Sequence, residues 1–293
     1  MRRIKPSFKL LIVILFVLAA SARAQSPATN PASVQISHAP PNPNLPTVFV
    51  VGDSTASNGA RNGWGDPLAD YFDPAKINAR NRALGGRSSR SFITEGHWGD
   101  VLKEMKAGDF VLIQWGQNDG GALDTGRARG SLPGLGEETK EVTMPATGEI
   151  EPPPPGTHEV VHTFGWYMRK YVADIKAKGA TPILMSLTAK DIWDNGKNRH
   201  PYDKYPEWTA AVAKSENVAY MDFNTMMGEK FDKMGQEKVH PLFTDTTHTK
   251  PEGADLNAAG VVAGLKSMNS PLVNYLSEKG KAVEAYMPAA AKP

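Results

Sequence analysis

The chain has 293 residues, a formal net charge of +2, 23 prolines, 27 glycines and no cysteine. This length allows one large domain or two small ones, with a hydrophobic core that needs no stabilising cross-links. The lack of cysteine excludes disulfides, thiolate nucleophiles, cysteine-based metal sites and a lipid-anchored cysteine, and a composition of 40% hydrophobic and 22% charged residues argues against a coiled coil or a disordered chain.

The first 24 residues have the order of parts that is typical of a secretory signal peptide. Residues 1–9 carry four basic side chains and no acid. Leu10–Ala20 is an unbroken apolar run of 11 residues, well short of the ~20 residues that span a bilayer. Ala22 and Ala24 supply the small side chains of a cleavage site. We therefore expect cleavage after Ala24 and a secreted or periplasmic protein with no membrane anchor in its mature form.

Removal of this segment changes the charge of the chain. Residues 1–24 contain 5 of the 33 basic residues and none of the 31 acidic ones. The mature chain therefore has 28 basic and 31 acidic residues, a net charge of −3. Because nucleic-acid binding calls for a basic face, we expect no nucleic-acid partner. The composition leaves the oligomeric state open.

A proline-rich segment separates the signal peptide from the rest of the chain. Residues 25–46 hold six prolines among serine, asparagine and alanine. Such a composition is typical of an extended linker, because it offers few apolar side chains to bury. We expect a single globular domain over residues 47–293.

Short apolar runs in this domain indicate buried parallel strands. Their alternation with helical stretches predicts an α/β domain with a doubly wound parallel sheet of about five strands between two layers of helices. In such sheets, functional residues gather beyond the carboxyl ends of the strands. The five runs are Thr47–Val51, Ile77–Leu84, Phe110–Trp115, Pro182–Leu187 and Val218–Asp222.

The clearest helix follows Thr163. Apolar side chains recur from Phe164 at positions i, i+4, i+7, i+8 and i+11, which form one face of a helix. Thr163 can cap the start of this helix, and Gly179 can end it. We expect further helices over Glu207–Ser215 and Ala254–Leu265.

Residues 120–161 interrupt the alternation of strands and helices. The segment is rich in glycine, proline, glutamate and threonine, and it contains the four-proline run Pro152–Pro155. A loop of this length inside a compact domain is usually either functional or disordered. We interpret it as a long insertion that borders the functional site.

Polar groups follow the first three strands. Ser54 comes after the first run, where a nucleophile could be presented, although a serine that caps the next helix is the more common case. Gly85 and Gly86 follow the second run, and Asn118 follows the third. Exposed backbone N–H groups of glycine and the side-chain amide of asparagine are donors that an oxyanion hole needs.

A fourth motif lies near the C-terminus, where Asp245 and His248 are three residues apart. If one turn of the loop brings them together, the carboxylate can hold one imidazole nitrogen and leave the other to act as a base. A surface histidine beside a capping aspartate would be the ordinary interpretation of this motif alone. The complete set of four motifs, in this order along the chain, instead predicts a serine hydrolase.

With these motifs the sequence resembles the SGNH (GDSL-type) hydrolases, and within them the rhamnogalacturonan acetylesterase-like branch. The resemblance covers most of residues 48–262. It implies a flavodoxin-like three-layer fold, with Ser54 as nucleophile, His248 as general base and Asp245 as its orienting carboxylate. It also implies an oxyanion hole formed by the Ser54 and Gly86 N–H groups and the Asn118 amide, with Gly85 as the neighbouring alternative to Gly86. It implies no metal or cofactor. The matching stretches are Gly52-Asp53-Ser54-Thr55, Gly86-Arg87-Ser88-Ser89-Arg90-Ser91, Gly116-Gln117-Asn118-Asp119-Gly120, Phe164–Tyr171 and Asp245-Thr246-Thr247-His248-Thr249.

A competing motif has the H-E-x-x-H spacing of zinc peptidases. His158 and His162 would bind zinc from one helix face and Glu159 would be the base. The motif lies just after Pro152–Pro155, at the expected start of a helix, with no third ligand at a familiar spacing. A junction between loop and helix is therefore the simpler interpretation.

The function that we expect is removal of acetyl groups from a plant cell-wall polysaccharide, with pectic rhamnogalacturonan favoured over xylan, other glycans or lipids. A binding module with an inactive site is disfavoured by the complete catalytic set. Several side chains could contact such a substrate: arginines could bind galacturonate carboxylates, and an aromatic ring could stack on a sugar, although a core tryptophan is more common. The candidates are Arg87, Arg90, Trp115 and Asp119, with Arg127 and Arg129 as further arginines.

Overall fold

The computed structural model describes residues 41–57, 59, 62–144, 156–199 and 204–288. The predicted signal peptide and residues 25–40 of the predicted linker lie outside the described residues. The end of the predicted linker is fixed on the domain, because Asn42 and the Asn78 side chain exchange two hydrogen bonds of 2.9 Å. Within the described ranges, no helix combines the length and the apolar character that crossing a membrane requires.

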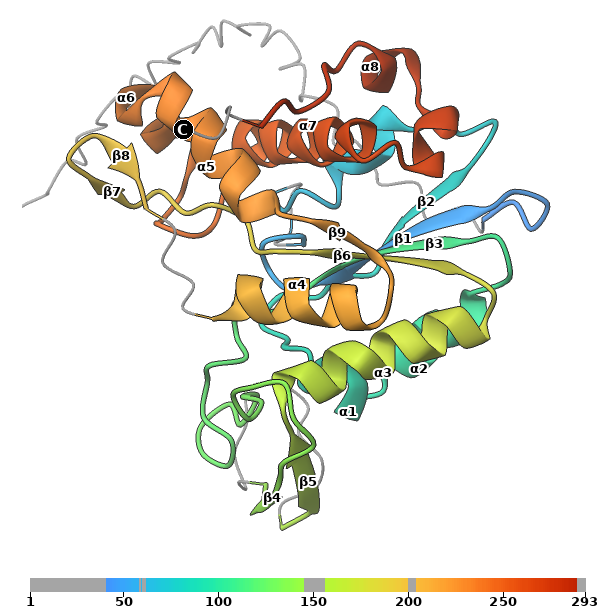
Figure 1. The fold of residues 1–293 in the computed structure, drawn as a ribbon, viewed down its shortest axis with the longest axis vertical. Helices are drawn as coiled ribbons and strands as arrows, with labels where there is room; N and C mark the ends of the chain where they lie inside the picture. The colour runs from blue at the N-terminus through green and yellow to red at the C-terminus, as the bar shows by residue number, and fades with distance from the viewer. Residues whose placement is uncertain (1–40, 58, 60–61, 145–155, 200–203, 289–293) are drawn as a thin grey trace, which may run out of the picture. The chain divides into compact units, whose positions relative to one another are not determined.

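A five-stranded parallel sheet forms the centre of the domain (Figure 1). Its strand order, β2-β1-β3-β6-β9, is that of flavodoxin-like folds, so the predicted sheet is confirmed. The second strand is shorter than expected and its side chains are only half-buried, because it lies at the edge of the sheet with one neighbour. The strands are β1 (Thr47–Gly52), β2 (Asn78–Asn81), β3 (Phe110–Gln114), β6 (Thr181–Met185) and β9 (Ala219–Met221).

Helices cover both faces of this sheet, and alternate strand residues pack against the two layers (Figure 1). On β1, Val48 and Val50 face one core together with residues of α5 (Phe223–Met234) and α7 (Pro251–Ser267). Phe49 and Val51 face the other core, which is built with residues of α2 (His97–Glu104), α3 (Phe164–Ala177) and α4 (Tyr205–Ser215). Because side chains of a strand alternate in direction, one apolar run serves both cores.

Helix α3 begins and ends as the sequence predicts. The Thr163 hydroxyl accepts a hydrogen bond of 3.1 Å from the Trp166 N–H, which satisfies one of the unpaired donors of the first turn. Gly179 follows the helix with a φ of +71°, a conformation that suits glycine. Helices α4 and α7 are each longer than expected and have proline in their first turn.

Several shorter elements have no counterpart in the sequence predictions. They are mostly a single turn long, so they carry too few residues to show a hydrophobic period. They comprise η1 (Pro67–Tyr71), α1 (Ser91–Thr94), the hairpin of β7 (Trp193–Asp194) and β8 (Lys197–Asn198), α6 (Gln236–Val239), η2 (His240–Leu242), η3 (Pro271–Tyr275) and α8 (Glu278–Lys281).

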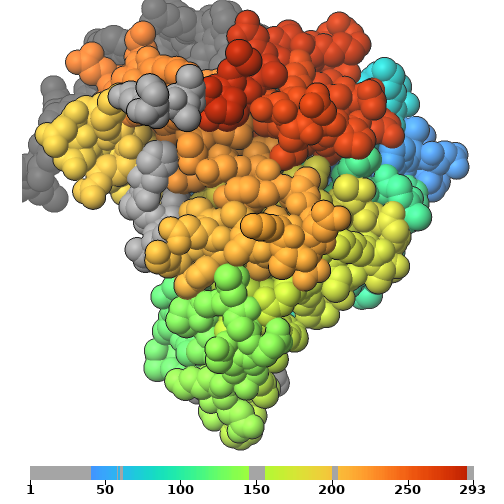
Figure 2. All heavy atoms as spheres, in the orientation of Figure 1, coloured from blue at the N-terminus to red at the C-terminus, as the bar shows by residue number. Residues whose placement is uncertain are grey.

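The long insertion contains a hairpin of its own, in which β4 (Thr139–Thr143) pairs antiparallel with β5 (His158–His162). A small apolar cluster that includes Val142 and Val161 packs under it. In the space-filling view, this green segment projects beyond α4 (Figure 2). The expectation that residues 158–162 begin a helix was wrong, since the whole motif forms strand β5.

We predict that Thr163→Ala lowers the free energy of unfolding by about 1–2 kcal/mol, because α3 loses its cap. The buried Thr163 hydroxyl also donates a hydrogen bond of 2.6 Å to the Gly136 carbonyl, which would lose its partner. Urea denaturation measures the loss. Thr139→Ala, at an exposed position of β4, is the control, and equal losses in both variants would contradict the capping role.

Candidate active site

The predicted motifs meet at the carboxyl edge of the sheet. They line a cleft of about 540 Å³ that is open to solvent. Ser54 enters it from the turn after β1, Gly85 and Gly86 from the loop after β2, and Asn118 from the loop after β3. His248 comes from the loop before α7. The complete lining is Ser54, Gly85, Gly86, Arg87, Gln117, Asn118, Arg127, Arg129, Thr247 and His248.

Ser54, His248 and Asp245 form a continuous chain of hydrogen bonds. Ser54 Oγ lies 2.9 Å from His248 Nε2, and His248 Nδ1 lies 2.8 Å from Asp245 Oδ2. Partial burial acts to raise the pKa of Asp245, but hydrogen bonds from the His248 ring and from backbone N–H groups outweigh it and lower that pKa to about 2. An ionised Asp245 accepts the Nδ1–H of the imidazole, which leaves Nε2 to accept the serine proton.

The backbone of the Asp245 loop explains how residues three apart can meet. Asp245 Oδ1 accepts hydrogen bonds from the N–H groups of Thr247, at 2.7 Å, and His248, at 2.8 Å. The aspartate thus closes a turn around its own side chain, as aspartates do in loops. Residues 245–248 do not form a helical turn. The Asx turn of Asp245 brings its carboxylate to the His248 ring instead.

Asp191 supports this loop and has no recognisable signal in the sequence. Its backbone N–H donates to the Thr246 carbonyl at 3.0 Å. Its buried carboxylate is held in place by His240 Nδ1 and Trp193 Nε1, each at 2.6 Å. The residue follows β6 in a stretch of ordinary polar composition, and only the fold brings it beside the histidine loop.

The expected oxyanion donors lie beside the serine. Among the described residues, neither the Ser54 nor the Gly86 backbone N–H has a hydrogen-bond acceptor. Gly86 has a φ of +80°, which side chains rarely permit. A methyl group added at Gly85 would lie 3.6 Å from Ser54 Cβ, so the neighbouring glycine also touches the serine. Asn118 uses one amide N–H on the Arg87 carbonyl, at 2.7 Å, and its second N–H remains for a ligand.

Two carboxyl groups are fully buried beneath these loops. Burial raises the pKa of Asp53 to about 6, although hydrogen bonds from Thr55 partly oppose it. Burial likewise raises the pKa of Asp119 to about 6, against hydrogen bonds from Ser89 and Ser131. The expectation that Asp119 contacts substrate is therefore wrong, because its side chain is enclosed by these partners.

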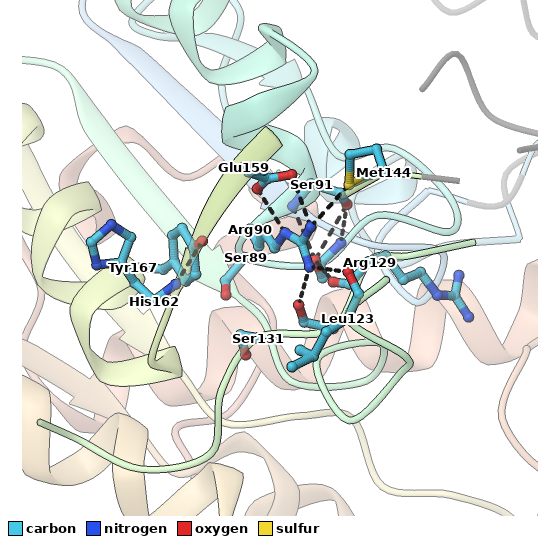
Figure 3. Close-up of polar contacts among 12 residues, drawn as sticks. Ser89, Arg90, Ser91, Leu123, Arg129, Ser131, Met144, Glu159, His162 and Tyr167 are labelled. Atoms are coloured by element: carbon cyan, nitrogen blue, oxygen red, sulfur yellow. Dashed lines mark hydrogen bonds and ion pairs between the residues drawn. The ribbon is translucent and has the colours of Figure 1, made fainter. Parts of the chain in front are cut away.

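Arg90 and Trp115 were also expected to contact substrate, and both are fully buried. The Arg90 guanidinium forms a two-point ion pair with Glu159, with N–O distances of 2.7 and 2.8 Å (Figure 3). The Trp115 ring packs between Phe92 and Tyr171 in the core. Neither side chain can reach a sugar. Trp115 directly follows β3 and still points into the core, so its position after a strand does not bring its side chain into the cleft.

Arg87 does line the cleft, together with Arg127 and Arg129. Arg87 pairs with Glu95 at 2.8 Å and keeps part of its guanidinium at the surface. Burial and the neighbouring Arg127 lower the pKa of Arg129, whereas Asp53 and Asp119 raise it. The cleft wall beside Ser54 is therefore cationic, with buried carboxyl groups behind it.

The zinc-peptidase interpretation fails on geometry. On strand β5, His158 and His162 are four residues apart, which separates their Cα atoms by about 13 Å, too far for two ligands of one ion. The His162 ring stacks on Trp166 with 3.7 Å between centroids. Glu159, the expected base, is the ion-pair partner of Arg90.

The chain is similar in sequence to a known family and to several known proteins. A sequence model of the GDSL-like lipase/acylhydrolase family matches residues 50–256. The chain is 31% identical to a rhamnogalacturonan acetylesterase of Emericella nidulans, over 72% of this chain and 81% of the relative. It is 28% identical to the probable rhamnogalacturonan acetylesterase YesY of Bacillus subtilis, over 78% of this chain and 93% of the relative.

Solved structures include the YxiM protein of Bacillus subtilis, which superposes with a TM-score of 0.61 at 26% identity. The superposition covers 78% of this chain and 58% of the YxiM chain, so this chain spans less than two thirds of that neighbour. The family match covers well over half of the chain and includes all four motifs in full. The chain therefore belongs to the GDSL-like lipase/acylhydrolase family, whose members are carboxylic ester hydrolases.

Proposed function

We propose that this protein is a secreted or periplasmic serine esterase that removes O-acetyl groups from a plant cell-wall polysaccharide, with pectic rhamnogalacturonan as the favoured substrate. The observation that carries the proposal is the hydrogen-bonded chain from Ser54 through His248 to Asp245, which opens into a cleft lined by three arginines. The names of the two curated relatives support acetylated rhamnogalacturonan as the substrate class.

In the first half of the reaction, Ser54 Oγ attacks the acetyl carbonyl carbon. His248 Nε2, 2.9 Å away, takes the hydroxyl proton as the new bond forms. Asp245 stays ionised because its pKa is about 2. It thereby holds the productive tautomer of His248 and stabilises the imidazolium that forms.

The tetrahedral intermediate carries a negative charge on the former carbonyl oxygen. We assign its stabilisation to the Ser54 and Gly86 N–H groups and to the second N–H of Asn118, with Gly85 as the neighbouring alternative. The sugar hydroxyl then leaves with the proton from His248. Water repeats the sequence on the acetyl-enzyme and releases acetate.

The cationic wall of the cleft favours an acidic chain over a neutral one. Arg87 and Arg127 lie beside Ser54, where they can bind the carboxylate of a uronate sugar next to the acetylated residue. General attraction cannot supply this preference, since the mature chain has a net charge of −3. Acetylated xylan, other glycans and long-chain esters are the competing substrates, and neutral xylan, neutral glycans and long-chain esters lack such a carboxylate.

We predict that Ser54→Ala abolishes acetate release and leaves the fold intact, because no other hydroxyl of the described residues is hydrogen-bonded to His248 Nε2. Acetate release from acetylated rhamnogalacturonan and circular dichroism measure the two properties. Ser215→Ala, at an exposed position of α4, is the matched control. Full activity in the Ser54 variant would refute the assignment of the nucleophile.

Asn118→Ala is expected to lower turnover by about 10²–10³-fold with little change in KM, because an oxyanion donor acts in the transition state and not in the ground state. Steady-state kinetics on a small acetate ester measure both constants. A decrease of less than about threefold would show that the amide takes no part in the oxyanion hole.

The arginine wall predicts a salt dependence that differs between substrates. Raising the salt from about 20 mM to about 300 mM should increase KM several-fold for acetylated rhamnogalacturonan and leave acetylated xylan and long-chain esters unaffected. Acetate release from this panel is the measurement. Faster, salt-independent hydrolysis of xylan or of long-chain esters would move the assignment to those substrates.

A further inference from the structure

The loop that carries Gly85 and Gly86, which we call the oxyanion loop, is held by hydrogen bonds to three consecutive carbonyl groups. The Gly85 carbonyl accepts from Arg87 Nη1 at 3.1 Å, and the Arg87 carbonyl accepts from Asn118 Nδ2 at 2.7 Å. The Gly86 carbonyl, between them, accepts from Arg129 Nη1 at 2.7 Å. Two of the donors belong to the expected motifs, but Arg129 comes from the long insertion.

These bonds matter because an oxyanion donor has to be held in one direction. A peptide group is planar, so fixing a carbonyl also fixes the N–H on the other side of the same bond. Gly86 has no side chain to restrict its backbone, and its φ of +80° lies where glycine moves most freely. The Gly86 N–H shares its peptide plane with the Gly85 carbonyl, to which Arg87 donates. Arg129 donates to the Gly86 carbonyl and so fixes the next peptide plane, on the other side of Gly86.

Arg129 is itself held by polar residues that follow the oxyanion loop in the chain. The Ser88 hydroxyl donates to the Arg129 carbonyl at 2.5 Å. Arg90 Nη1 donates to the next carbonyl, that of Gly130, at 2.8 Å. The Ser131 N–H donates to the Asp119 carbonyl at 2.9 Å, and Ser131 Oγ lies 3.2 Å from the buried Asp119 carboxyl group. The backbone of residues 129–131 is therefore clamped at each residue.

The remaining N–H groups of the Arg90 guanidinium bind the hairpin of the insertion. Its Nε and Nη2 groups bind both carboxylate oxygens of Glu159 on β5 (Figure 3). A path of direct contacts thus runs from β5 through Arg90 and Gly130 to Arg129, and from Arg129 to the Gly86 carbonyl.

We infer that Arg129 is a positioning residue that holds the oxyanion loop in its productive orientation, and that the Arg90–Glu159 ion pair keeps Arg129 in place. The inference rests on the proposed esterase function. It makes Arg129 and Glu159 of the insertion a supporting part of the catalytic centre, in addition to any contact that Arg129 makes with substrate.

The test uses the full chain and p-nitrophenyl acetate, a neutral ester with no carboxylate for an arginine to bind. Arg129→Gln and Arg129→Lys should both lower kcat by about 10–100-fold, with KM within about twofold of the wild type and the melting temperature unchanged. Lysine keeps the charge but lacks the planar fork of donors, so it should not restore kcat. Arg169→Gln is the matched control, because Arg169 also donates to carbonyls of the insertion, those of Leu135 and Gly136.

Two further variants test whether Glu159 on the β4–β5 hairpin keeps Arg129 in place. Glu159→Gln should lower kcat per folded molecule on the same ester, measured well below its melting temperature. Glu141→Gln, at an exposed position of the partner strand β4, should not. A Glu159 variant that loses stability but keeps its kcat would overturn the link between the hairpin and the loop.

An Arg129→Gln variant that keeps its kcat on the neutral ester would overturn the positioning role. A rise in KM confined to acetylated rhamnogalacturonan would instead make Arg129 a contact for the substrate carboxylate. The Ser54→Ala variant separates this inference from the proposed function. If that variant stays active, the esterase assignment itself fails. If it is inactive while Arg129→Gln is fully active, only the positioning role fails.

Discussion

A guanidinium that is shut off from water has to find an acceptor for each of its five N–H groups, and this requirement on Arg90 organises the region around the cleft. Glu159 accepts two of them, the carbonyls of Leu123 and Gly130 accept two more, and the Met144 sulfur accepts the fifth. Removing one partner of such a buried pair costs about 3–5 kcal/mol. Leu123, Gly130, Met144 and Glu159 of the insertion are therefore fixed to Arg90, four residues after Gly86.

In the same region, the acidic groups are buried and the basic groups line the cleft. Asp53 and Asp119 are buried beneath the loops, and burial raises the pKa of each to about 6. Arg127 and Arg129 lie in front of them, along the cleft. In the proposed mechanism, an acyl oxygen that becomes negative faces the backbone N–H groups and the Asn118 amide, and not the carboxyl groups. The carboxyl groups lie behind this layer, where both act to raise the pKa of Arg129. Asp119 accepts hydrogen bonds from Ser89 and Ser131, and Asp53 accepts them from Thr55.

Features that depend on residues close together in the chain were predictable from the sequence. The direction in which an individual side chain points was not. The strands of the sheet and the cap of α3 follow from local composition, so the fold was predicted correctly. The H-E-x-x-H motif was misplaced because residues i and i+4 share a face on a helix and on a strand alike. The two β-branched valines between its histidines, Val160 and Val161, were the available signal for a strand.

The misplaced substrate contacts have a related cause. Ends of parallel strands meet at one edge of the sheet, and this rule located the site. However, alternate residues there point in opposite directions. Trp115, directly after β3, therefore enters the core on the α3 face. Arg90 has a different cause, since it lies just before α1 and its ion pair with Glu159 holds it away from the cleft. The sequence alone could not show this, because the partners that attract each side chain lie up to 69 residues away.

Both halves of the candidate site depend on such distant partners. The His248 loop is fixed by the backbone of Asp191, which is itself held by Trp193 and His240. The oxyanion loop is fixed by Arg129 from the insertion. A nucleophile and a base work only when their separation is held to a few tenths of an ångström. The four motifs supply the reacting groups, and segments outside the motifs set the distances between them.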